Sequence, residues 1–151
     1  DMTLTLESIK AEQSKLADMI ARLEAQAGRT IDFPAATITL AQGEHYAGII
    51  IGEDNAPSYH LILLQGAGED MDWSAAKAWA AQSGGELPIR REQSLLYANL
   101  KDQFADEWYW SGEAHEDTRY AWAQYFNIGL QDDYYADNQF RSRSVRRLVI
   151  E

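Results

Sequence analysis

Three stretches in the last third of the chain decide its fold: WYWS at residues 108–111, YAWAQYF at residues 120–126 and VRRLVI at residues 145–150. Aromatic and β-branched side chains are enriched in strands, so these stretches predict short strands. The polar stretch QDDYYADNQ, residues 131–139, lies between the second and the third. Its composition suits recognition better than a core, because tyrosine, aspartate and asparagine combine contact area with adaptable hydrogen bonding. We therefore expect a β scaffold that presents a binding loop.

Length, charge and cysteine usage limit the classes of protein that the chain can belong to. The 151 residues suffice for one compact domain with an appendage, and a net charge of -11 disfavours nucleic acid as a partner. The chain contains no cysteine, which excludes disulfides, thiolate metal sites and thiol nucleophiles. No apolar run is long enough to span a bilayer, so membrane insertion is not expected. Because the chain starts at Asp1 rather than at methionine, we expect that an upstream region is missing.

The basic residues gather at the end of the chain. Four arginines, against Glu151 alone, give residues 141–151 a local charge of +3. They are Arg141, Arg143, Arg146 and Arg147. This cluster leaves room for a local anion site in an otherwise acidic chain.

Residues 1–28 follow a heptad pattern that predicts a coiled-coil oligomerisation helix. One core position holds Leu6, Gln13, Ile20 and Ala27, and the other holds Met2, Ile9, Leu16 and Leu23. The residues expected at the oligomer interface are Leu6, Ile9, Gln13, Leu16, Ile20 and Leu23. A polar core residue such as Gln13 fixes the register of the helices. We expect a homo-oligomer, a trimer in preference to a dimer; the alternative is one amphipathic helix that lies on its own domain.

Residues 29–151 show the mixed periodicity of an α+β domain. Short aliphatic runs at residues 36–40, 45–52 and 59–64 predict a β-meander, and residues 145–150 predict a final strand. Two helices are expected between them. Asp72 can cap a helix that runs to Gln82, and leucines four residues apart predict a second helix over residues 91–104.

An ordered series of motifs carries a resemblance to a known family. The motifs are MDWSAA at residues 71–76, GGELPIRRE at 84–92, WYWS at 108–111, AW at 121–122, FNIG at 126–129 and VRR at 145–147. Over residues 44–148 the chain resembles the domains of unknown function typified by the C-terminal domain of collagen-like adhesins, which bacteria and phages encode. Ile89 departs from that pattern, in which threonine usually follows Leu-Pro.

The resemblance implies a fold and an origin. It implies a C-type-lectin-like domain with two helices and short antiparallel strands, related to sulfatase-modifying factors and to the variable proteins of retroelements, and a phage or prophage origin. In such a fold the first long strand, residues 45–52, is expected to pair with the last, residues 145–150.

No catalytic constellation is found, so we do not expect an enzyme. The cysteines of sulfatase-modifying enzymes are absent, as are the Glu-Pro-Asn and Trp-Asn-Asp triplets of calcium-dependent lectins. At two places a bound cation is less favoured than a solvated loop. They are the group Asp132, Asp133, Asp137 and Asn138, and the stretch EAHED at residues 113–117, which contains a histidine. No cofactor is expected. His45 and His60 are expected to be structural. Trp73, Trp110 and Trp122 are expected in the core.

The binding residues are expected in the polar loop, although a loop that is merely exposed remains the alternative. They are Asp132, Asp133, Tyr134, Tyr135, Asp137, Asn138 and Gln139. The expected function is a ligand-binding module, resembling a phage tail-fibre tip or a bacterial adhesin, that attaches multivalently to a cell-surface glycan or protein. It would act on the virion or at the cell surface. The alternative is a cytoplasmic prophage protein whose acidic surface binds and inhibits a host protein.

Overall fold

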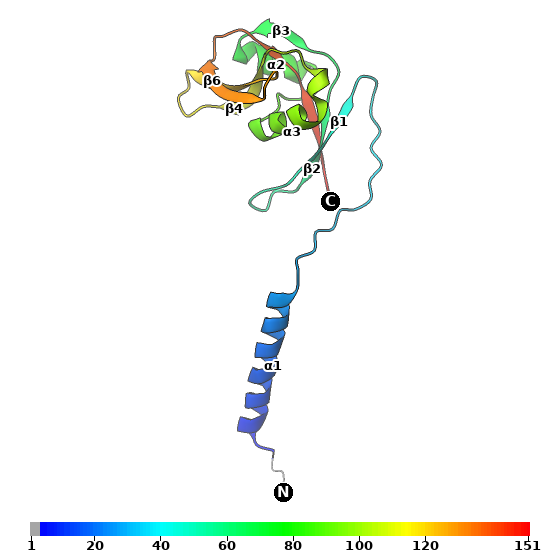
Figure 1. Cartoon of the computed structure of the whole chain (residues 1–151), viewed down its shortest axis with the longest axis vertical. Helices are drawn as coiled ribbons and strands as arrows, with labels where there is room; N and C mark the ends of the chain where they lie inside the picture. Colours follow the sequence, from blue (N-terminus) through cyan, green and yellow to red (C-terminus); the bar gives the residue numbers. More distant parts are fainter. Residues whose placement is uncertain (1–3) are drawn as a thin grey trace. The chain divides into compact units, whose positions relative to one another are not determined.

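The computed structural model describes residues 4–151, which form two compact units (Figure 1). The first unit ends at Phe33 and the second, the globular unit, comprises Pro34–Glu151. The predicted boundary after residue 28 falls in the segment between helix α1 and the globular unit. Met2, the first residue of the predicted heptad, lies outside the described residues.

The first unit contains a single helix, α1 (Leu6–Gln26). Thr5 caps it, because the Thr5 side chain accepts a hydrogen bond from the Ser8 backbone while the Ser8 hydroxyl caps the backbone N–H of Thr5 in return. The helix ends at Ala27, whose backbone is extended. None of its residues is buried. Its stability therefore does not come from packing within the described part of the chain.

The globular unit is an α+β structure, as predicted from the sequence. With α1, the described residues contain three α-helices, one 3-10 helix and eight strands. The elements of the globular unit are β1 (His45–Ile50), β2 (Tyr59–Leu63), β3 (Gly68–Met71), α2 (Trp73–Gln82), α3 (Arg90–Leu100), the 3-10 helix η1 (Lys101–Gln103), β4 (Trp108–Ala114), β5 (Tyr120–Tyr125), β6 (Leu130–Tyr135), β7 (Phe140–Ser142) and β8 (Val145–Val149). Both predicted helices are present, but α3 passes into η1 instead of continuing to Phe104.

One sheet is antiparallel and has the strand order β1-β2-β8 (Figure 1). The prediction that the first and last strands pair directly is wrong, because β2 lies between them and Leu61 pairs with both Gly48 and Arg147. The predicted strand at residues 36–40 is also wrong, since this segment pairs with no other strand. One face of the sheet contributes Leu61, Leu63 and Val145 to a core with Leu96 of α3.

The other sheet has five strands in the order β3-β7-β4-β5-β6. All its pairs are antiparallel except β4 with β7. One face packs against α2, where Ala76 and Ala80 meet the fully buried Trp110. Asp72 caps α2 as predicted, since its carboxylate accepts the Ala75 N–H at 2.8 Å. This packing leaves β6 as an edge strand, and the opposite face of β5 and β6 is partly open.

Candidate binding surface

The predicted binding loop is mostly strand. Four of the seven predicted residues, Asp132, Asp133, Tyr134 and Tyr135, belong to β6, and the other three, Asp137, Asn138 and Gln139, form the turn before β7. The prediction of a loop failed because an edge strand faces water along its outer side and tolerates polar residues that resemble a loop.

Strand alternation divides these residues between two faces of the sheet. Tyr134 turns toward α2 and packs on Trp108 and Phe140, with ring centroids 4.7 Å and 5.2 Å away. Asp133 and Tyr135 lie on the other face, where they pair with Trp122 and Tyr120 of β5. The predicted residues therefore do not form one site. The open face brings two of them together with residues that the sequence did not assign to the binding site.

We call this face the β5–β6 surface and define it by six residues that meet there. They are Arg90, His115, Tyr120, Trp122, Asp133 and Tyr135. Three side chains are tyrosine or tryptophan, one is a guanidinium, one is an imidazole and one is a carboxylate. Such a set supplies flat apolar area together with hydrogen-bond donors and acceptors, which is the composition of a recognition surface.

A stacked pair of tyrosines forms one end of the surface. The rings of Tyr120 and Tyr135 lie 4.5 Å apart at an interplanar angle of 28°, and 51% of Tyr135 is exposed. The hydrogen bond to Tyr135, followed by partial burial, raises the pKa of Tyr120 above its ordinary value. The Tyr120 hydroxyl, which is protonated at neutral pH as in any tyrosine, can serve a ligand as donor or acceptor.

Trp122 forms the centre of the surface. The guanidinium carbon of Arg90 lies 3.6 Å from the Trp122 ring centroid, and the His115 ring lies 5.5 Å away. Trp122 is partly exposed, so the expectation that it belongs to the core is wrong, whereas Trp110 is fully buried as expected. Trp73 is partly buried and packs at the margin of the α2 core. Alternation along β5 explains the result for Trp122, because Ala121 and Ala123 take the buried face.

Two bonds fix the imidazole of His115 at the surface. Its Nε2 lies 3.3 Å from Asp133 Oδ2, and its Nδ1 accepts the Asp117 N–H at 3.0 Å. The neutral imidazole therefore carries its proton on Nε2, facing the Asp133 carboxylate. Glu113, which was expected in a hydrated loop, lies in β4. No group of three or more His, Cys, Asp or Glu side chains in residues 4–151 is placed to hold a metal ion.

A polar network holds the Arg90 side chain in place. Its Nε donates to Gln131 Oε1 at 3.1 Å, and the Gln131 amide donates to the buried Gln124 at 2.7 Å. The backbone N–H of Arg90 donates to Glu113 Oε1 at 2.9 Å. Sequence reasoning missed Arg90, since its partners lie 23 and 41 residues away. The one signal in the sequence was that Trp122 and Gln124 are two residues apart in a strand and therefore lie on the same face.

An ion pair borders the surface at the β4–β5 turn. Arg119 contacts both carboxylate oxygens of Asp117, with the shortest distance 2.6 Å. Hydrogen bonds from the Arg119 side chain lower the pKa of Asp117 to about 2. Both side chains are at least partly exposed, so this pair adds charge to the rim of the surface and little stability.

The C-terminal arginines do not form the anion site for which the sequence left room. Arg146 pairs with Glu44 at 3.0 Å, Arg147 pairs with Glu92 at 2.6 Å and Arg141 lies 3.8 Å from Glu69. The buried Arg143 donates to the backbone carbonyls of Gln103 and Leu64. Each guanidinium is therefore engaged by groups of the chain itself.

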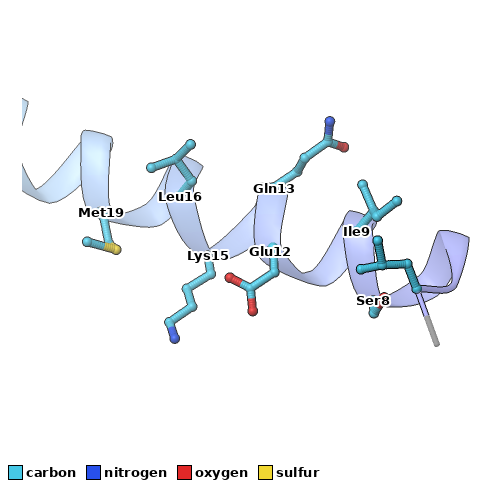
Figure 2. A pocket seen from close by; sticks show the side chains of 8 residues that line it. Ser8, Ile9, Glu12, Gln13, Lys15, Leu16 and Met19 are labelled. Carbon is cyan, nitrogen blue, oxygen red and sulfur yellow. The ribbon is translucent and has the colours of Figure 1, made fainter. Parts of the chain in front are cut away.

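The first unit presents a separate apolar surface along α1. Ile9, Gln13 and Leu16 project from one side of the helix, whereas Glu12 and Lys15 project from the opposite side (Figure 2). The apolar side chains are largely in water, with exposed fractions from 46% for Ile9 to 69% for Leu23. Leu6, Leu16 and Ile20 fall between these values. An exposed stripe of this kind marks an interaction surface.

Comparison with known proteins does not identify the chain. No family model and no curated protein matches its sequence. In the described part of the chain, no helix combines the length and the apolar character needed to cross a membrane.

Proposed function

We propose that the chain is an oligomeric binding module. In this proposal α1 self-associates as a coiled coil, with a trimer preferred to a dimer, and each globular unit attaches to a cell-surface glycan or protein. The module would serve as the tip of a phage tail fibre or as part of a bacterial adhesin. The β5–β6 surface is the proposed ligand site.

The observation that carries the proposal is the aromatic group formed by the partly exposed Trp122 and the Tyr120–Tyr135 stack, in which Tyr135 is exposed. Aromatic rings with polar atoms beside them contact sugar rings or peptide side chains at low entropic cost, because they have few rotatable bonds. Asp133, His115 and Arg90 border these rings and supply fixed hydrogen-bonding groups. Because their positions are held by the chain, little ordering is needed when a ligand binds.

A C-type-lectin-like fold is part of the proposal. It is supported by the two helices of the globular unit and by its short, mostly antiparallel strands. The motif tryptophan Trp110 is fully buried, as a scaffold residue of such a domain would be.

Self-association of α1 would raise the overall affinity for a ligand-bearing surface, because several weak ligand sites would then bind together. Exposed leucine and isoleucine side chains on α1 bury their apolar area only when other helices cover them. Joining several binding units raises the effective concentration of the second contact, and overall avidity then exceeds single-site affinity by about 10² to 10⁴.

Substitution of the aromatic group tests the ligand site. Tyr135→Ala combined with Trp122→Ala should lower attachment to bacterial cells and to glycan arrays at least about tenfold, since large aromatic contacts dominate binding energy. The matched control is Ile128→Ala, which removes a 62% exposed apolar side chain outside the surface. Attachment at the wild-type level by the folded double variant would refute the site.

A second candidate function follows from the charge of the chain, which is -11. A cytoplasmic prophage protein with this charge would capture a basic host protein and inhibit it. Capture of that type weakens steeply between low and high salt and survives Tyr135→Ala. Salt-insensitive attachment to cells that is lost in the aromatic variant would exclude this alternative.

A further inference from the structure

The β1-β2-β8 sheet has an outer face that no helix covers. Its inner face packs on α3, whereas Tyr46, Ile49 and Leu148 share the outer face because Ile49 and Leu148 both pair with His60. We call the residues Ile38, Leu40, Tyr46, Ile49, His60 and Leu148 the outer patch. Leu40 and Tyr46 are each 40% exposed and Leu148 is 37% exposed. Large apolar side chains therefore remain partly exposed on this face, above the fully buried Ile62 that pairs with Tyr46.

A groove runs through the outer patch. It has a volume of about 330 Å³ and lies between the extended segment that starts at Pro34 and the sheet, with Pro34, Ala36, Ile38, Leu40, Tyr46 and His60 as its lining. The Tyr46 hydroxyl and His60 Nδ1 are 2.8 Å apart, so the polar atoms of the groove satisfy each other. The surface that the groove offers to a partner is therefore mainly apolar.

The outer patch is electrically balanced within a strongly acidic unit. Residues 34–151 contain eighteen Asp and Glu against nine Lys and Arg. At the patch, however, Arg146 contacts both carboxylate oxygens of Glu44 at 3.0 Å and reaches the carbonyl of Thr39. Two copies of an acidic protein repel each other over most of their surfaces, and contact costs least where the charges are already paired.

We infer that the outer patch packs against the globular unit of a second copy of this chain. The inference rests on the proposed self-association of α1. Helix α1 ends at Gln26 and the groove begins at Pro34, so seven residues join them and the distance from Gln26 to Pro34 is at most about 28 Å. Associated helices would therefore hold neighbouring grooves at high effective concentration, where a small apolar contact suffices.

Introducing charged residues into the outer patch provides the first test. Leu40→Glu combined with Leu148→Glu should weaken self-association of the full chain at least about tenfold in sedimentation equilibrium, because carboxylates without partners then enter an apolar contact. The matched control is Ile128→Glu with Leu130→Glu, which places the same charge on residues that are 62% and 49% exposed. The control should keep the wild-type dissociation constant. Equal constants for the two variants would overturn the inference.

A thiol probe gives a second test that does not require the charged variant to fold. The chain contains no cysteine, so Leu148→Cys introduces a single thiol. Maleimide should label it at least about tenfold more slowly in the oligomer than in a monomer produced by Leu16→Glu in α1. Fast labelling in both forms means that the patch stays open, and slow labelling in both means that the same chain covers it; either result overturns the inference. A wild-type chain that is monomeric by sedimentation would instead refute the proposed association of α1.

Discussion

Glu92 shows how one residue can hold three elements of the fold together. Its side chain has no solvent exposure, yet each of its oxygens is hydrogen-bonded. Arg147 of β8 donates to both oxygens at 2.6 Å and 2.8 Å, and Tyr59 of β2 donates at 2.7 Å. The Ile89 N–H donates at 2.8 Å at the start of α3. A buried charge of this kind is tolerated because its partners replace water completely.

Removal of this charge should destabilise the fold. Glu92→Gln leaves the Arg147 guanidinium partly buried without its main partner, and we expect the free energy of unfolding in urea to fall by about 3–5 kcal/mol. Glu86→Gln is the matched control, since Glu86 also contacts Arg147 but its side chain is 76% exposed. That control should change stability by about 0–1 kcal/mol. Equal losses would show that burial of Glu92 is not the cause.

Tyr59 should make stability depend on alkaline pH. Burial, followed by the hydrogen bond to Glu92, raises the pKa of Tyr59 from about 10 to about 12. The folded state therefore favours the neutral phenol, whose contribution is complete below pH 10 and is lost as the pH rises through about 12. At pH 8 we expect Tyr59→Phe to be less stable than wild type by about 1.5–3 kcal/mol. Melting curves should show this gap closing between pH 10 and 12, and a gap independent of pH would contradict the assignment.

At the level of elements, local signals were readable from the sequence and long-range signals were not. Asp72 marked the start of α2 because a cap depends on residues three positions away. Residues 36–40 have the composition of a strand, but strand formation requires a partner and none pairs with them. The position of Arg90 over Trp122 depends on contacts between α3 and β5, which no spacing in the sequence reveals.

The core of the proposed α1 oligomer can be tested at Gln13. A polar residue at a core position lowers stability in return for a fixed register. Gln13→Leu should therefore strengthen helix association by about 1.5–3 kcal/mol per chain, because a leucine side chain becomes buried. Thermal unfolding followed by circular dichroism would show a higher midpoint, and sedimentation would show whether a single stoichiometry persists. A lower midpoint would place Gln13 outside the core.

On the scale of the whole molecule, the division into two units would, in the proposed function, separate assembly from attachment. The first unit presents apolar side chains along α1, and the globular unit presents the β5–β6 surface.

The segment between α1 and the globular unit should be the preferred site of proteolysis. Arg29 is exposed and lies in neither helix nor strand. Proteases act fastest on such segments, so brief trypsin treatment should release residues 30–151 as the first product, identified by its mass. Arg29→Gln removes the site and should slow the reaction. First cleavage within the globular unit would contradict the division into two units.

The alternation along β5 and β6 has a consequence for how the protein can change. Ala121, Ala123 and Tyr134 fill the interior, while Trp122, Asp133 and Tyr135 face outward. In the proposed function, replacement of the outward residues would alter what the surface recognises while the interior residues beside them stay unchanged. New specificities would then be accessible one residue at a time, and this sheet would be a suitable starting point for selecting new binders.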